Sequence, residues 1–247
     1  MQLPVLRLMM SKGPSAGSMQ AVLAAAFKAS LPVLLGYGTI GLAFGLVLVG
    51  AGLPAWLSPL MALFVYAGAA QFMGVGLLAA GTALPEIALL TLLLNARHAV
   101  YGLSMLRPFS GSSWRKPYLI FALTDETYGL LTTVRVPETA SAHNFYFLIS
   151  LLNQSYWFVA CTLGALLGAA LPFDTSGLDF ALTALFVVLL VEQIRKTPRP
   201  EPYLVAVAAA ALAWILVAAT NFLLLALLVS IFAISLLRRR LEERLPE

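Results

Sequence analysis

Four short stretches interrupt an otherwise apolar chain, and they hold the side chains that could bind a ligand or carry a proton. In the first, residues 66–72, Tyr66, Gly68 and Gln71 stand among small residues. A tyrosine and a glutamine can offer hydrogen bonds to a polar ligand without bringing in a charge. The stretch predicts a substrate-binding segment, with a purely structural hydrogen bond between helices as the alternative for Gln71.

The second stretch, residues 95–102, combines an amide, a guanidinium and an imidazole. On a helix Asn95 and His98 share one face, whereas Arg97 points elsewhere and is expected to pair with another helix. His98 ionises in the physiological range, which makes it a candidate proton carrier. The alternatives are a satisfied interior histidine and an arginine that extends to the membrane surface.

The third stretch places Asp125 next to Glu126 within the apolar segment 118–134. Two adjacent carboxylates in such a segment are costly unless they are paired or functional. One could neutralise Arg97, and the other could meet a substrate ammonium group or carry a proton. The alternative is a short amphipathic surface segment with both acids in water. Asn153, in the polar run 153–156, is a further candidate for substrate binding.

The fourth stretch, residues 36–45, contains four glycines and follows Pro32. Glycine and proline weaken a continuous helix, so we expect a broken span with exposed backbone at Tyr37 and Gly38. A helix N-terminus at such a break attracts a carboxylate. The alternative is close helix packing through a four-residue glycine spacing, which occurs at Gly41/Gly45 and again at Gly164/Gly168.

The composition indicates that the candidate site residues are positioned by helices embedded in a lipid bilayer. Of 247 residues, 61% are hydrophobic and only 11% are charged, and the mean hydropathy is +0.92. Soluble domains carry about a quarter charged residues. The composition predicts an all-α, polytopic integral membrane protein and excludes a soluble enzyme, a disordered chain and a nucleic-acid binder. The net charge of +4 comes from basic residues in loops and the C-terminal tail, as in cytoplasmic loops.

Eight candidate spans cover residues 29–53, 57–81, 85–106, 118–134, 144–171, 178–194, 202–219 and 222–237. Placing the basic loops 107–117 and 195–201 and the tail in the cytoplasm makes 118–134 a non-spanning or broken segment. This gives about seven transmembrane helices, with eight as the alternative. Residues 1–26 form a polar N-terminal segment, 27–237 a single membrane transport domain, and 238–247 a charged tail.

Short motifs recur in the same order and predict an internal repeat. Residues 50–54 resemble 168–172, residues 62–65 resemble 184–187, and Gln71 matches Gln193. Repeat 1 would cover about 27–106 and repeat 2 about 144–219, with a connecting segment at 107–143 and a final helix at 222–237. Repeats of three helices would be inverted, which together with broken helices is typical of secondary transporters. No metal-ligand spacing, nucleotide loop or nucleophile motif is present, so we expect no cofactor, no metal and no enzyme activity.

The runs 66–72, 95–104 and 123–127, followed by 177–181, resemble the large subunit of the branched-chain amino-acid exporters, the AzlC/BrnF family of LIV-E type permeases. The similarity covers about residues 28–220. One departure is the glycine-rich run 36–41, which stands where a proline-containing pattern is expected. The resemblance implies a multi-pass permease of the bacterial inner membrane that exports leucine, isoleucine and valine, with methionine as a further candidate. It also implies drive by the proton-motive force and a small hydrophobic membrane subunit of the AzlD/BrnE type.

A zwitterionic amino acid needs one site for its carboxylate and one for its ammonium group. The glycine-rich first span or Arg97 could supply the first, and Asp125 or Glu126 the second. An apolar pocket could be formed by Phe44, Phe64 and Phe72.

Three alternatives to this interpretation stay open. The chain could transport another small amphipathic metabolite, or it could be a membrane assembly subunit that transports nothing. A membrane-embedded enzyme is the third, with His98, Asp125 and Glu126 as its polar cluster.

Overall fold

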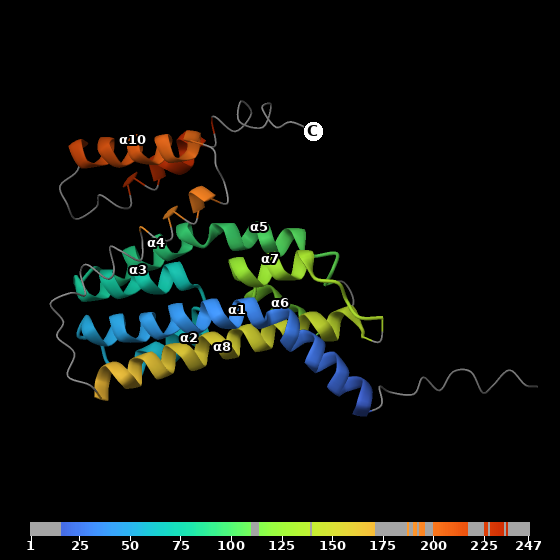
Figure 1. Cartoon of the computed structure of the whole chain (residues 1–247). Helices are drawn as coiled ribbons and strands as arrows, with labels where there is room; N and C mark the ends of the chain where they lie inside the picture. Colours follow the sequence, from blue (N-terminus) through green and yellow to red (C-terminus); the bar gives the residue numbers. More distant parts are fainter. Residues whose placement is uncertain are drawn as a thin grey trace, which may run out of the picture. The chain divides into compact units, whose positions relative to one another are not determined.

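The computed structural model describes residues 16–109, 114–138, 140–170 and 200–216, together with shorter pieces of 187–195 and 225–236. Every regular element among these residues is a helix, so the all-α class is confirmed for them (Figure 1). The helices are α1 (Ala16–Gly50), α2 (Leu57–Phe64), α3 (Gly68–Ala79), α4 (Leu84–Leu94), α5 (Ala96–Ser104), α6 (Lys116–Phe121), α7 (Asp125–Thr133), α8 (Ala142–Ala170) and α10 (Pro200–Leu216).

The chain divides into two compact units. The first holds residues 1–87 and 94–178, and the second holds residues 88–93 and 179–247. By length and composition, three described helices can cross a membrane, namely Gln20–Gly50, Leu84–Ser104 and Ala142–Ala170. The predicted spans 178–194 and 222–237 and the second copy of the repeat lie partly outside the described residues.

In the first unit, α1 and α8 pack side by side and run in the same direction. The contacts advance together along both helices: Gly41 lies against Ala160, Gly45 against Cys161 and Ala165, and Gly168 against Val49. A Cβ atom on Gly45 would overlap the backbone of α8. The glycines therefore permit a close approach of two helix backbones, which is the packing alternative named above.

Helix α1 is continuous from Ala16 to Gly50, although Pro32 lies inside it. Figure 1 shows α1 bending in its N-terminal part, as expected of a long helix that contains a proline. The break expected between Gly36 and Gly45 is absent. The packing of Gly41 and Gly45 against α8 offsets the weak helix propensity of glycine.

The common direction of α1 and α8 also corrects the expected repeat. The motif alignment superimposes the end of α1 on the end of α8, and elements related by inversion must run in opposite directions. These two helices run in the same direction, so a repeat aligned in this way is not inverted.

Helices α2 and α3 form a hairpin instead of the single span expected at 57–81. Along α2, Ser58 bonds Cys161 and the Leu63 carbonyl accepts from Gln154, so α2 runs antiparallel to α8. Helix α3 returns beside α2, with Gly74 against Met61. The turn is at Tyr66, whose φ of 41° lies in the left-handed region and ends α2.

Helices α6 and α7 form a second hairpin, which enters from the opposite end of the α1/α8 pair. Arg115, just before α6, donates to Asn144 near the start of α8, and Tyr118 reaches Gln154 further along. Helix α7 then returns, with Thr127 bonded to Asn153. The segment 118–134 is therefore broken, as the sequence predicts, and it begins and ends on one side.

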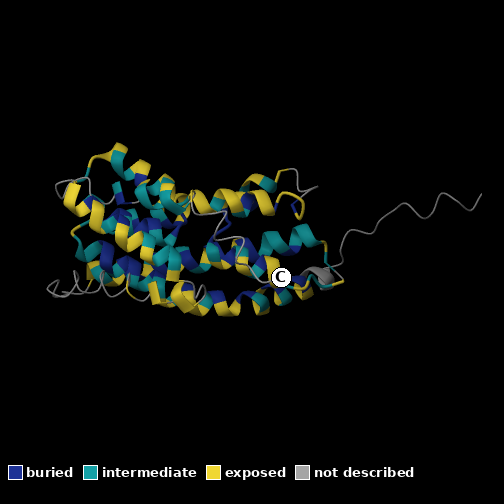
Figure 2. Ribbon diagram, turned by 90° about the horizontal axis from the view of Figure 1, so that it is seen from above, coloured by how far each residue is buried: buried dark blue, intermediate teal, exposed yellow. Residues whose placement is uncertain are grey.

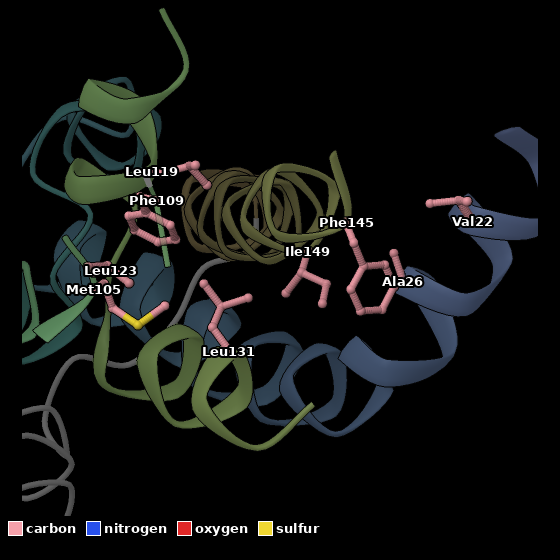
Figure 3. Packing of buried hydrophobic residues seen from close by; sticks show 9 residues of the cluster. All are labelled: Val22, Ala26, Met105, Phe109, Leu119, Leu123, Leu131, Phe145 and Ile149. Carbon is pink, nitrogen blue, oxygen red and sulfur yellow. The ribbon is translucent and has the colours of Figure 1, made fainter. Parts of the chain in front are cut away.

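A buried apolar cluster anchors the base of the second hairpin. Figure 3 shows Phe145 and Ile149 of α8 lying between Leu131 of α7 and Ala26 of α1. Figure 2 shows that the long helices each carry buried positions on one face and exposed positions on the other. Large apolar side chains on exposed faces, such as Leu35 and Leu166, are what a lipid environment requires.

Candidate functional site

The tips of the two hairpins meet beside the middle of α1 and α8. Tyr66 at the first tip faces Phe121 at the second, with ring centroids 6.3 Å apart. Because α3 and α7 both start at these tips, two helix N-termini point to the same central region. In transporters, such half-helix ends at mid-membrane bind ionic groups of the substrate.

A chain of polar side chains crosses this region from α1 to α8. The Tyr37 hydroxyl donates to Glu126 at 2.9 Å and lies 2.6 Å from the Thr124 hydroxyl. The hydroxyls of Thr124 and Thr127 lie 3.1 Å apart, and Asn153 Nδ2 donates to Thr127 at 3.1 Å. Except for Glu126, these residues are buried.

A second buried pair joins α3 to α8. The indole N–H of Trp157 donates to Gln71 Oε1 at 2.9 Å, and the same indole edge packs against Gly68. The Trp157 ring also meets the Tyr37 ring edge-on at 5.1 Å. Phe44 packs against both Phe72 and Trp157. Phe64, expected in the same apolar pocket, is instead 69% exposed.

Three buried polar atoms in this region have no hydrogen-bond partner among the described residues: Tyr66 Oη, Gln71 Nε2 and Asn153 Oδ1. Their side chains are almost completely inaccessible to solvent. Leaving a buried polar group unpaired costs about 1–3 kcal/mol, so each of these atoms is expected to bond a partner such as a water molecule or a polar ligand. A donor, an acceptor and a hydroxyl are together suited to a small polar ligand.

The two helix N-termini differ in charge. Thr124 caps α7 by accepting from the Thr127 N–H, and the first turn carries Asp125 and Glu126. The first turn of α3 has no side-chain cap and no acidic residue, and its N-cap position is Ala67. An uncapped N-terminus attracts an anion, whereas an acidic one attracts a cation.

Arg97 pairs with another helix, as expected. Its Nη2 lies 2.9 Å from Asp125 Oδ2, and the other carboxylate oxygen accepts from Tyr101 at 2.7 Å. The rings of Tyr101 and Tyr128 stack at 4.4 Å. Both side chains of the pair are partly exposed. Because Arg97 is paired with Asp125 of α7, its position does not have to be explained by extension to the membrane surface alone.

The remaining predicted residues lie apart from the central network. His98 packs edge-on against Tyr101, and its Nδ1 lies 3.2 Å from the Asn95 carbonyl. The Asn95 side-chain oxygen is buried without a partner. Gly38 follows Tyr37 on α1 with open space where a side chain would start.

Several network residues were not predicted as site residues, namely Thr124, Thr127, Trp157, Tyr118 and Gln154. Helical spacing could have identified one of them, because Trp157 follows Asn153 by four residues and so shares its face. The described residues contain no group of three or more histidine, cysteine, aspartate or glutamate side chains that could hold a metal ion. Cys161 is buried and unpaired, in agreement with a packing role.

The AzlC protein family matches residues 32–171, which contain both hairpins and most of the network. The chain belongs to the AzlC family. An uncharacterized membrane protein of Helicobacter pylori is 41% identical over 88% of this chain and 95% of its own length. The branched-chain amino acid transport protein AzlC of Bacillus subtilis is 32% identical, over 88% of this chain and 86% of its own length.

A third relative, the inner membrane protein YgaZ of Escherichia coli, is 30% identical over 68% of this chain and 72% of its own length. No solved structure matches the chain at a significant level. Membership of the AzlC family makes this a membrane protein of a transport family, in agreement with its apolar helices.

Proposed function

We propose that this AzlC-family chain is the large subunit of a secondary active exporter of branched-chain amino acids in the bacterial inner membrane. The observation that carries the proposal is the meeting of two hairpin tips beside three buried polar atoms without partners. The relationship to a branched-chain amino acid transport protein supports the choice of substrate. Leucine, isoleucine and valine are the proposed substrates, and methionine is a further one.

The substrate carboxylate binds at the N-terminus of α3. This end is uncapped and free of acidic residues, and Gln71 Nε2 is a buried donor in its first turn. Side chains on a helix lean toward its N-terminus, so the Gln71 amide supplements the backbone N–H groups that follow Gly68. This site replaces the first span and Arg97 as the expected carboxylate site, because α1 is unbroken and Arg97 is paired with Asp125.

The substrate ammonium group binds on the side of α7 and α8, where Glu126 supplies negative charge and Asn153 Oδ1 is an acceptor without a partner. Tyr37 and Tyr66 line the space between the two ends of the substrate. Phe44, Phe72 and Trp157 provide apolar surface for a branched side chain. Gly38 and Asn95 remain candidate contacts at the edges of this site.

Transport uses the two hairpins as alternating gates, because each enters from a different end of the α1/α8 pair. Residues 16–79 and 84–133 each contain one apolar helix followed by one hairpin, so we propose these segments as the inverted pair. Arg97, His98, Asp125 and Glu126 handle charge and protons during the cycle. A small hydrophobic subunit of the AzlD/BrnE type works with the chain.

The test is efflux of radiolabelled leucine from proteoliposomes that contain the chain and the co-expressed small subunit, with and without an imposed proton gradient. We expect gradient-dependent efflux that valine competes for and glutamate does not. Asp125→Asn and His98→Ala should each alter the rate or its pH dependence. Efflux that both variants leave unchanged would show that these residues do not handle protons.

Other outcomes point to the alternatives. Efflux of a different amphipathic metabolite would preserve the transporter and change its substrate. Absence of any efflux, with normal assembly of the variants, would favour an assembly subunit. Chemical conversion of the substrate without net movement would favour an enzyme.

A further inference from the structure

Gln154 of α8 is hydrogen-bonded to both hairpins through the two ends of one side chain. Its Nε2 donates to the Leu63 carbonyl of α2 at 3.1 Å, and its Oε1 accepts from the Tyr118 hydroxyl of α6 at 2.9 Å. The side chain is buried, with 7% of its surface exposed. Because α2 belongs to the first hairpin and α6 to the second, one amide connects both proposed gates to α8.

The orientation of this amide follows from the chemistry of its two partners. A backbone carbonyl can only accept, so it must face the NH₂ group, and Oε1 is left to face Tyr118, whose hydroxyl donates. Leu63 is the last residue but one of α2, and carbonyls in the last turn of a helix lack a partner within that helix. The Leu63 carbonyl therefore depends on a donor from outside α2, and Gln154 supplies it.

The neighbours of Gln154 on α8 connect to one hairpin each. Asn153 donates to Thr127 of α7 in the second hairpin, and Trp157 donates to Gln71 of α3 in the first. Gln154 differs from them because its bonds extend to both hairpins. Movement of either hairpin away from α8 therefore breaks one bond of Gln154, and movement of both hairpins breaks two.

We propose that Gln154 is a positioning residue that holds both hairpin gates closed against α8 and so suppresses the state in which both are open. Opening of one hairpin, which transport requires, breaks one hydrogen bond and leaves the other in place. Opening of both hairpins breaks two and lets solutes leak through the protein. A hydrogen bond between membrane helices shifts an equilibrium by about threefold, so Gln154 disfavours the doubly open state by about tenfold. The inference rests on the proposed function, because it takes the two hairpins as the gates.

The first experiment measures the opening of each hairpin by the reactivity of a single cysteine and needs no substrate. The first reporter is Ala62→Cys in α2, and the second is Ala122→Cys at the end of α6; both alanines are completely buried. Each follows by four residues a side chain that is bonded to α8, namely Ser58 and Tyr118, so the two reporters are matched.

The chain with its small subunit is placed in lipid nanodiscs, and the rate of reaction with a maleimide reports how often each reporter becomes exposed. The single native cysteine, Cys161, is buried at the contact of α8 with Gly41 of α1, so it should stay unreactive when a hairpin opens.

The two bonds of Gln154 can be removed together or one at a time. Gln154→Leu removes both and keeps a side chain of similar size, so both reporters should react about threefold faster. Tyr118→Phe removes the bond to the second hairpin and keeps the ring packed against Phe147. In this variant the second reporter should react about threefold faster and the first should react at the wild-type rate.

Ser155→Ala is the matched control, because Ser155 is the exposed neighbour of Gln154 and its hydroxyl bonds its own helix at Leu151. It should leave both rates unchanged. Wild-type rates in Gln154→Leu, or a Tyr118→Phe variant that affects both reporters alike, would overturn the proposal. If Cys161 becomes reactive in Gln154→Leu, the α1/α8 pair itself has loosened. Tyr118→Phe then decides, and any result other than a faster reaction confined to the second reporter overturns the proposal.

The second experiment measures leak through the protein. Proteoliposomes without leucine carry an imposed pH gradient, and its decay is followed with an internal pH-sensitive dye. The decay caused by the protein should be about tenfold faster in Gln154→Leu and about threefold faster in Tyr118→Phe, because these variants lose two bonds and one bond. Leucine binding should stay close to that of the wild type in both variants. Faster labelling of both reporters without faster decay would show that Gln154 does not suppress a leaking state.

The proposed function and the role of Gln154 fail in different ways. Absence of leucine efflux, with the expected labelling and leak in the variants, would refute the proposed substrate and leave the role of Gln154 standing. Leucine efflux by the wild type, with labelling and leak unchanged in Gln154→Leu, would do the reverse.

Discussion

Arg97 of α5 and Asp125 of α7 form an ion pair of 2.9 Å that connects an apolar, membrane-length helix to the tip of a broken hairpin. The same carboxylate accepts from Tyr101, whose ring stacks on Tyr128. Asp125 is the first residue of α7, so the pair holds the start of the half-helix that carries Glu126. The side chains of Arg97 and Asp125 are 40% and 37% exposed.

Neutralising one partner of this pair should disable transport, and neutralising both should restore much of it. A charge left unpaired within a span costs about 2.5–3.5 kcal/mol, and this would displace the hairpin tip. We expect Arg97→Gln and Asp125→Asn each to lower leucine efflux at least about tenfold, which is the effect of about 1.4 kcal/mol. The double variant should recover to within about threefold of the wild type.

Arg107→Gln is the matched control, because it removes a positive charge from the exposed end of the same region. Its efflux should stay at the wild-type rate. Single variants with normal efflux, or a double variant as slow as the slower single one, would show that the pairing itself is unimportant.

The hydrogen bond between Trp157 and Gln71 should affect protein stability and leucine binding in ways that two variants can separate. Trp157→Phe removes the donor and leaves both ends of the Gln71 amide unpaired, so it should lower the free energy of unfolding by about 1–3 kcal/mol. Adding Gln71→Leu removes the orphaned amide and should recover most of that stability. Leucine binding should be lost in the double variant, because the donor Nε2 is gone.

Unfolding in detergent and equilibrium leucine binding are the two measurements, and Trp56→Phe at an exposed position is the control. A double variant that still binds leucine with wild-type affinity would exclude Gln71 from the carboxylate site.

Local physical rules were enough to predict part of this architecture from the sequence. The apolar composition predicts helices, and placing the basic loops in the cytoplasm predicts that 118–134 is a broken or non-spanning segment. The cost of a lone arginine predicts that Arg97 has an acidic partner. The glycine spacing, named as an alternative, predicts the close approach of α1 and α8. Each of these predictions depends only on the residues of one segment or on the need to pair one buried charge.

The features that were not predicted depend on tertiary contacts. Four glycines suggest a break in α1, but glycine weakens a helix by only about 1 kcal/mol each, and packing against α8 offsets this. The chain is broken instead at Tyr66, between α2 and α3. The left-handed backbone conformation of this tyrosine costs about 1–3 kcal/mol, and the contacts of its buried side chain maintain it. The direction of α8 relative to α1 has no signature in hydropathy, so the sequence could not show that the motif alignment pairs two helices that run in the same direction.

Tyrosine hydroxyls on the two hairpins should respond in opposite ways to removal. The Tyr66 hydroxyl is buried without a partner, so Tyr66→Phe should leave stability unchanged or raise it by about 1 kcal/mol. The Tyr118 hydroxyl donates to Gln154 at 2.9 Å, so Tyr118→Phe should lower stability by about 1 kcal/mol. Leucine affinity should fall in Tyr66→Phe only. If Tyr66→Phe proves the less stable of the two, its hydroxyl has a structural partner and no role in binding.

Adding a side-chain carbon at the glycine contact between α1 and α8 should lower the stability of the protein. In Gly164→Ala the new Cβ would overlap the backbone of Leu42, and overpacking of this kind costs about 1–3 kcal/mol. Gly36→Ala is the matched control on α1, because nothing lies within 4 Å of the position of its Cβ, and alanine favours the helix. Gly164→Ala should also lower leucine efflux, because Asn153 and Trp157 move with α8. Equal stability of the two variants would mean that α1 and α8 are further apart at this point than the structure places them.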